Sequence, residues 1–233
     1  MKYKNIIDGR FLERPNRFIA HVEINGKMEV CHVKNTGRCR ELLVPGAKVF
    51  LQIAENPARK TKYDLIGVVK NQLMVNMDSQ IPNKVVEEWL RADHTLFEDP
   101  IIRPEKKYGN SRFDLYVEDG DRKAFIEVKG VTLEVDGVAS FPDAPTERGI
   151  KHLMELQKCL QDGYEAYVFF VIQMKGIHKM QPNWERHKAF GEALLAAAKA
   201  GVRVLAYDCL ITEDSIQIDA PVPVDLGEKN EFE

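Results

Sequence analysis

Features that would narrow the function of this 233-residue chain are scarce. The four cysteines lie far apart with no CxxC spacing, so we expect free thiols rather than a disulfide framework or a zinc motif. No apolar run approaches the roughly 18 residues needed to cross a bilayer. The N-terminal segment is charged and lacks the apolar core of a signal peptide. We therefore expect a cytoplasmic protein that does not contact a membrane.

A strong excess of one charge is also absent. The 33 lysines and arginines face 36 acidic residues, which gives a net charge of −3, so global electrostatics does not indicate a polyanionic partner. The basic residues are nevertheless gathered in segments 34–40, 58–62 and 103–112. These clusters by themselves favour solvated surface, yet they also allow a local basic groove.

Residues 1–78 show short apolar runs separated by turns. Two runs, 17–24 and 27–33, flank Asn25-Gly26, the strongest hairpin signal in the chain. Further strands are expected near 47–54 and twice within 63–77. This pattern predicts a small β-barrel of OB type, with a sandwich fragment as the alternative. We place a domain boundary near residue 80 and expect residues 1–80 to form an OB-like, nucleic-acid-binding domain.

Residues 81–233 alternate between strands and helices. A helix over 81–92 could be capped by Asn83, and a second could run from Thr146 to Gly163. A strand buried on both faces is expected over 164–174, followed by a helix over 183–201 and a strand over 202–211. With a preceding hairpin, the order β-β-β-α-β-α-β predicts a mixed α/β sheet with helices on both faces.

The segment SRFDLYVEDGDRKAFIEVKG, residues 111–130, carries charges on otherwise apolar strands. A two- or four-residue loop at Asp119-Gly120 would place Val117 opposite Arg122. Side chains alternate along a strand, so one face is expected to carry Arg112, Asp114, Phe125, Glu127 and Lys129. The other face is expected to carry Phe113, Leu115, Val117, Ala124, Ile126 and Val128.

Three of these charged residues suggest a reaction centre. The carboxylates of Asp114 and Glu127 would repel each other unless a cation lay between them. Oxygen ligands without thiolate or imidazole favour Mg²⁺ or Mn²⁺, and the ammonium group of Lys129 would lie beside that metal. The alternative is a surface hairpin in which Arg112 and Glu127 form an ion pair. If a helix covers this face, burying carboxylates without a partner would cost free energy. This favours a metal site over the surface hairpin.

The arrangement Asp114, Glu127 and Lys129 on a hairpin resembles the PD-(D/E)xK nuclease superfamily. The chain is also similar to the sugar fermentation stimulation protein A family. The segments that carry this resemblance are NRF (16–18), HVKNTGRCRELLVPG (32–46), EKKYGNSRFDLYV (105–117), FIEVKGVTL (125–133) and FPDAPTERGIKHLMEL (141–156).

This resemblance implies an OB-like domain followed, over 81–233, by a PD-(D/E)xK nuclease-like domain, and it implies DNA binding. Asp114 and Glu127 would hold the metal, and Lys129 would be catalytic. The helix starting near Thr146 would lie over the site, so that Arg148 could contact the scissile phosphate, with Glu147 and His152 nearby. A further metal ligand could come from Glu87, Glu88 or Glu105.

Basic residues on both halves are candidates for DNA contact. In the first domain they are Arg17, Lys34, Arg38 and Arg40, and in the second they are Lys106, Lys107 and Arg112. Residues 35–37 form a turn whose backbone N–H groups could approach a phosphate. Phe18 could stack on a base, although a place in the barrel core is the favoured reading.

Two functions follow from these observations. The first is a metal-dependent phosphodiesterase acting on single- or double-stranded DNA. The alternative is a non-catalytic DNA-binding regulator of sugar-utilisation (maltose-type) genes that retains the nuclease fold. A small-molecule enzyme using the same metal pocket is a third class. The sequence leaves open whether cleavage is retained and whether the protein forms a homodimer.

Overall fold

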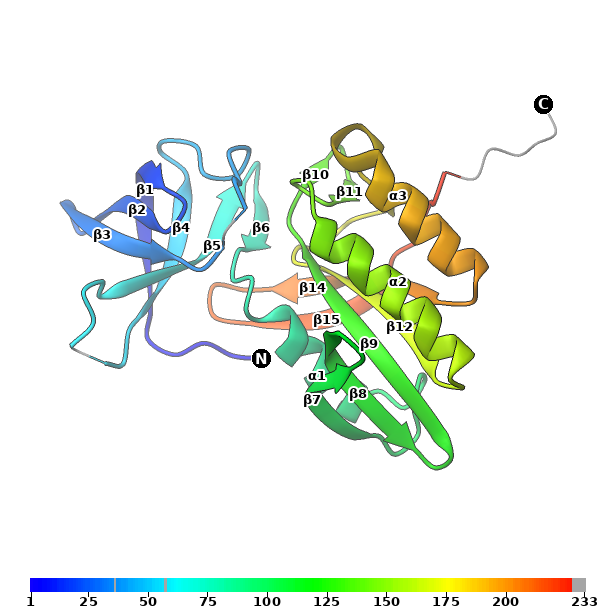
Figure 1. Ribbon diagram of the computed structural model, residues 1–233. Coiled ribbons are helices and arrows are strands. Elements are labelled where there is room, and N and C mark those ends of the chain that lie inside the picture. Colours follow the sequence, from blue (N-terminus) through cyan, green and yellow to red (C-terminus); the bar gives the residue numbers. More distant parts are fainter. Residues whose placement is uncertain (36, 57, 228–233) are drawn as a thin grey trace.

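The computed structural model describes residues 1–35, 37–56 and 58–227. Its chain folds into a barrel and a larger α/β unit, which lie side by side in Figure 1. A short connection after the barrel leads into the first helix, and the N-terminus lies near that helix. None of the helices in these three ranges is long and apolar enough to span a membrane.

The barrel consists of β1 (Ile6–Asn16), β2 (Ile19–Ile24), β3 (Lys27–Val33), β4 (Lys48–Ile53) and β5 (Tyr63–Lys70). Parallel pairing of β3 with β5 closes the sheet order β3-β2-β1-β4-β5, and β6 (Leu73–Asn76) extends it. The OB-type barrel is therefore confirmed. The sequence pattern did not indicate β1, because register shifts after Phe11 interrupt its alternation.

The second sheet contains β7 (Ile101–Tyr108), β8 (Ser111–Asp119), β9 (Arg122–Val131), β12 (Glu165–Ile172), β14 (Arg203–Ile211) and β15 (Ile216–Pro221). Its order is β15-β14-β12-β9-β8-β7, with parallel pairing of β12 to both β9 and β14 and antiparallel pairing elsewhere. A small sheet of β10 (Glu134–Val135), β11 (Val138–Phe141) and β13 (Lys179–Pro182) is added. The expected mixed sheet is confirmed.

Helices cover both faces of this sheet. The first, α1 (Pro82–Ala92), packs Val86 into the same apolar cluster as Phe169 of β12. On the opposite face, α2 (Glu147–Gln161) packs Leu156 into the cluster that contains Phe170, and α3 (Trp184–Lys199) lies against α2 (Figure 1). Adjacent residues of β12 thus face different helices, which explains the uninterrupted apolar run in its sequence.

Of the two N-cap residues predicted from the sequence, the one for α2 is confirmed and the one for α1 is wrong. The Thr146 side chain accepts a hydrogen bond from the Gly149 backbone N–H, so the predicted N-cap of α2 is confirmed. The predicted cap of α1 is wrong. Ile81 occupies the N-cap position, Pro82 begins the helix, and Asn83 lies inside the first turn, where its amide group is free to bond elsewhere.

A buried polar cluster joins the two units. Gln173, which is only 1% exposed, follows β12 and donates to Asn76 Oδ1 at 2.9 Å and to the Asp78 carbonyl at 3.1 Å. Asn76 in turn donates to the hydroxyl of Tyr3 at 2.9 Å. Because these buried groups satisfy one another, they fix the barrel against the α/β unit.

Candidate metal site and nucleic-acid interface

The hairpin of β8 and β9 differs in register from the sequence prediction. Asp119 pairs with Arg122, so the loop is Gly120-Asp121, and the pairing of the two strands is shifted by two residues from the expected one. Val117 therefore faces Ala124 rather than Arg122. The strand is extended to Asp119 because that carboxylate accepts the backbone N–H groups of Glu98 and Asp99, each at 3.0 Å.

Side-chain alternation along β8 breaks at Asp114. Phe113 belongs to the cluster under α2, where its ring lies 5.3 Å from that of Phe125, whereas Leu115 belongs to the cluster under α1. The expectation that Phe113 and Leu115 share a face is therefore wrong. The β8–β9 ladder reaches only to the Leu115–Ile126 pair, so the strands separate where Asp114 lies.

The Asp114 side chain fills the gap left by this separation. Its Oδ2 accepts the backbone N–H of Val128 at 2.8 Å, and its Oδ1 accepts the amide of Asn83 at 2.8 Å. The sequence did not indicate this contact between Asn83 of α1 and Asp114. In the sequence, an asparagine near a helix start has the same pattern whether its side chain caps the helix or bonds a distant carboxylate.

Glu127 lies beneath α2 and is only 3% exposed. Its Oε1 accepts hydrogen bonds from the ammonium group of Lys129 and from Nδ1 of His152. Its Oε2 is buried and has no hydrogen-bond partner within the described residues. A buried carboxylate oxygen without a partner is costly, and its position beside Asp114 suits a cation.

The two carboxyl groups have opposite pKa shifts. Burial, together with the nearby charge of Glu127, raises the pKa of Asp114. Burial also acts to raise the pKa of Glu127, but the hydrogen bond from His152 and the charge of Lys129 outweigh it and lower that pKa. Such a divergent pair of neighbouring acids is typical of a functional site.

His152 comes from the second turn of α2. Its ring nitrogen Nε2 accepts a hydrogen bond from Arg148 Nε at 3.4 Å while Nδ1 donates to Glu127. Because Arg148 lies four residues earlier on the same helix, an Arg148–His152–Glu127 chain connects the exposed start of α2 to the buried acid. The sequence suggested that these residues lie near the site, but it did not indicate the direct contact.

Gly130, immediately after Lys129, allows α1 and the inter-domain joint to approach the site. A Cβ at this position would lie 2.5 Å from Gln173 Oε1 and 2.9 Å from Pro82 Cγ. A side chain here would therefore collide with the side chains of Gln173 and Pro82 unless they moved. The glycine of the IEVKG segment is required by this packing.

The three glutamates that could supply a further metal ligand each pair with a basic group in the structure. Glu87 bonds Arg91 at 2.8 Å, Glu88 pairs with the N-terminal amine of Met1 at 2.7 Å, and Glu105 pairs with Arg112 at 3.3 Å. Within residues 1–35, 37–56 and 58–227, no group of three or more histidine, cysteine, aspartate or glutamate residues is arranged to hold a metal. Asp114 and Glu127 remain the pair of acids that could hold one.

On the barrel, the structure brings three of the predicted DNA-contact residues together. Arg17, Arg38 and Arg40 line a surface hollow of about 400 Å³ with Arg14. Arg14 donates to the carbonyl oxygens of Arg17, Asn35, Gly37 and Arg38 at 2.7–2.9 Å. It thereby holds the segment that carries the other arginines. Of the turn at 35–37, Thr36 lies outside the described residues.

Replacing Arg14 with lysine is expected to loosen this segment. A lysine keeps the charge but cannot donate in a fork to four carbonyl groups. We expect amide exchange at Gly37, whose N–H bonds Asn35 Oδ1 at 2.7 Å, to accelerate about tenfold in hydrogen-exchange measurements, because roughly 1.4 kcal/mol of local stability is lost. Arg10→Lys, at an exposed position on the same strand, is the control; equal exchange in both variants would contradict the role of Arg14.

The remaining predicted DNA-contact residues have different surroundings. Lys34 is 18% exposed and lies between the carboxylates of Asp64 at 3.7 Å and Asp78 at 3.2 Å. The charge of Lys34 is thus compensated by these two carboxylates within the protein. Phe18 is 46% exposed and lies under Arg17, with the guanidinium carbon 4.8 Å from the ring centroid. The expectation of a core position for Phe18 is therefore wrong, and its ring is accessible for stacking.

Comparison with known proteins gives a consistent answer. Residues 12–77 match the model of the SfsA N-terminal OB domain, and residues 80–215 match that of the sugar fermentation stimulation protein RE domain. The chain belongs to the sugar fermentation stimulation protein family. A homolog from Clostridium beijerinckii is 60% identical over 97% of this chain and 100% of its own length. One from Desulfitobacterium hafniense is 61% identical over 98% of this chain and 100% of its own length.

A solved member of the sugar fermentation stimulation protein family has the same fold. The structure of Pyrococcus furiosus SfsA in complex with Ca²⁺ matches with a TM-score of 0.85 and 26% identity, over 97% of this chain and 98% of that one. The family resemblance seen in the sequence is thus confirmed along nearly the whole chain.

In the present protein, the basic residues of β7 and β8 lie at one end of the large sheet, where β7 is the edge strand and β8 its neighbour. Lys106, Lys107 and Arg112 are exposed, and Lys107 pairs with Arg112 in the ladder. The Lys106 ammonium lies 5.4 Å from the ring centroid of Tyr116. Tyr108 is half-buried, and its hydroxyl donates to Asp162 at 2.5 Å. The lysines and Arg112 therefore form the accessible part of this edge.

Proposed function

We propose that this protein is a DNA-binding, divalent-metal-dependent phosphodiesterase of the PD-(D/E)xK type. The observation that carries the proposal is the buried Glu127 Oε2, which lacks a partner in the described part of the chain and lies beside the high-pKa carboxyl group of Asp114. Two acids in this state are destabilising unless a cation joins them.

Asp114 and Glu127 fit Mg²⁺ or Mn²⁺ because they offer hard oxygen ligands. That Pyrococcus furiosus SfsA was solved in complex with Ca²⁺ supports a divalent cation here as well. Such a cation supplies Lewis-acid polarisation of a phosphoryl oxygen. The amide of Asn83 and the ring of His152 orient the two acids toward it.

The remaining side chains would act on the phosphodiester directly. Lys129 lies at the edge of the acid pair and carries a charge that can stabilise the negative charge developing on the phosphorus oxygens. Arg148, exposed at the first turn of α2, can bind the phosphate, and the helix N-terminus adds its partial positive charge. Arg17, Arg38 and Arg40 on the barrel would hold the DNA backbone.

Cleavage assays with labelled DNA test this proposal. We expect the protein to cut single- or double-stranded DNA in Mg²⁺ or Mn²⁺ and to stop cutting in EDTA. Lys129→Ala is expected to lower the rate by roughly 100-fold or more, because the charge beside the scissile phosphate is lost. Lys123→Ala, an exposed position on the same strand, is the control and should cut like the unmodified protein.

The alternative is a DNA-binding regulator of sugar-utilisation genes that does not cut. The exposed arginines and Phe18 of the barrel support DNA binding without requiring the acid pair. DNA binding that persists in every variant, with no product in any metal, would favour this regulator. A homodimer is a proposal for either function, and sedimentation of the protein with and without DNA tests it.

A further inference from the structure

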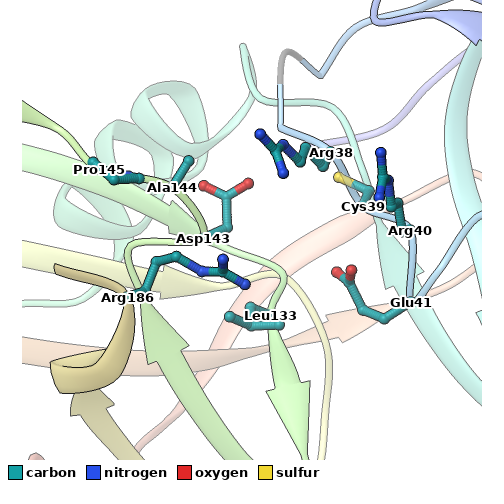
Figure 2. Close-up of a pocket in the computed structure, with 9 residues that line it drawn as sticks. All are labelled: Arg38, Cys39, Arg40, Glu41, Leu133, Asp143, Ala144, Pro145 and Arg186. Atoms are coloured by element: carbon teal, nitrogen blue, oxygen red, sulfur yellow. The ribbon is translucent and has the colours of Figure 1, made fainter.

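A hollow between the two domains collects three arginines. About 350 Å³ in volume, it is lined by Arg38 and Arg40 from the barrel segment between β3 and β4 and by Arg186 from the first turn of α3. In residues 1–35, 37–56 and 58–227, none of these three guanidinium groups has a hydrogen bond, ion pair or ring contact. Figure 2 shows the Arg186 guanidinium directed into the hollow beside Leu133.

The charge and shape of this hollow suit one nucleotide unit. Three guanidinium groups against the carboxylates of Glu41 and Asp143 leave one net positive charge. The floor is apolar, since Leu133, Ala144 and Pro145 line it together with Cys39. Arginines bind phosphate through two parallel N–H donors, while an apolar floor accepts a sugar or base. The volume lies in the range of small-ligand sites.

Neighbouring hollows continue this one in both directions. Arg38 and Arg40 also line the barrel hollow that contains Arg17, which lies on one side. Asp143 and Leu133 also line a hollow of about 180 Å³ on the other side, which reaches Gly130, the residue after Lys129. The three hollows adjoin one another through these shared residues, and together they mark a path from the exposed barrel arginines to the end of β9, the strand that carries Glu127 and Lys129.

We propose that a single strand of nucleic acid follows this path, with Arg186 and the barrel arginines Arg38 and Arg40 gripping one of its phosphates between the domains. The inference rests on the proposed function, because it assumes a polynucleotide, but it adds strand preference and a contact from α3. A hollow that fits one nucleotide unit does not accommodate the width of a duplex. The gripped phosphate lies on the way to the acid pair, so it would orient the strand toward Lys129.

The test measures binding without cleavage. Fluorescence anisotropy of a labelled oligothymidylate of about 16 nucleotides, in EDTA and over a series of salt concentrations, reports the affinity and its salt dependence. We expect Arg186→Ala to weaken binding about five- to tenfold and to lower the salt slope by about 0.7. Arg186→Lys, which retains the charge, should recover most of the slope. Lys188→Ala on the same helix, where Lys188 pairs with Glu192 at 3.4 Å, should bind normally.

Three outcomes would overturn the proposal. The first is Arg186→Ala binding the oligonucleotide as tightly as Lys188→Ala, with the same salt slope. The second is an equal loss of affinity for a duplex of the same sequence, which would remove the strand preference. The third is weakened binding of thymidine monophosphate with unchanged oligonucleotide binding, which would assign the hollow to free nucleotides. Because no arm depends on cleavage, a failure of the nuclease proposal is seen separately, as binding without product.

Discussion

Replacing Asp114 with asparagine is expected to abolish metal-dependent DNA cleavage while making the metal-free protein more stable. Asparagine has the same shape, and its oxygen can still accept the Val128 N–H that Asp114 accepts at 2.8 Å. Its NH₂ group can donate to Asn83 once the Asn83 amide rotates to present its oxygen. It lacks the negative charge needed to hold a divalent cation beside Glu127. We expect the cleavage rate to fall by roughly 1000-fold or more.

The gain in stability follows from the raised pKa of Asp114, whose causes are burial and the charge of Glu127. Where the folded pKa exceeds the unfolded one, the unfolded chain releases its proton first, so stability falls as pH rises through that window. At neutral pH the charged carboxylate is therefore unfavourable. Asparagine removes this cost, and we expect about 1 kcal/mol of stabilisation and a Tm about 2–4 °C higher in EDTA.

Thermal unfolding of the two proteins across a pH series measures this effect. The difference in Tm should shrink as the pH falls through the pKa of Asp114, because the protonated acid and the amide are then both neutral. A divalent cation should raise the Tm of the unmodified protein but not that of the variant. Asp121→Asn in the exposed turn of the hairpin is the control. A lower Tm for Asp114→Asn would show that the charged Asp114 carboxylate does not destabilise the folded protein. Undiminished cleavage would show that Asp114 is not part of the catalytic site.

Replacing Gln173 with alanine is expected to give the largest loss of stability among these variants. Its amide donates to Asn76 Oδ1 and to the Asp78 carbonyl in a fully buried position. Alanine would leave these acceptors short of a donor and create a cavity at the joint between the domains. We expect a loss of about 2–3 kcal/mol and a Tm lower by about 5–10 °C.

Calorimetry of this variant also reports on the coupling between the domains. If the Gln173 cluster fixes the barrel against the α/β unit, we expect the unmodified protein to unfold in one transition and the variant's transition to broaden or split into two. Gln80→Ala removes an exposed amide close to the same joint and should change stability by no more than about 0.5 kcal/mol. Equal Tm values for the two variants would show that the cluster contributes little.

Local sequence patterns were sufficient to predict the fold. Asn25-Gly26 marked the β2–β3 hairpin, Thr146 marked the start of α2, and the apolar run of β12 marked a strand buried on both faces. Each of these three features depends on residues near one another in the chain, and for this reason the sequence alone predicted them. The domain boundary near residue 80 and the assigned site roles remain predictions.

The sequence was less informative about contacts between residues that are far apart in the chain. That Asp114, Glu127 and Lys129 share one face of the hairpin remains a prediction, and the predicted pairing of the two strands was wrong by two residues. The sequence did not reveal the break in alternation that moved Phe113 to the α2 face, since that break depends on how β8 packs against His152 and Phe125.

The sequence by itself thus determined the fold class and the family, and it predicted the acids and lysine of the candidate site. The tertiary structure decided the long-range contacts: Asn83 bonds Asp114, His152 bonds Glu127, and, in a separate hollow, Arg186 lies with the barrel arginines Arg38 and Arg40. The reason is physical. Strand and helix patterns arise from periodic burial along the chain, whereas these contacts join segments that only the packing of helices and domains brings within reach.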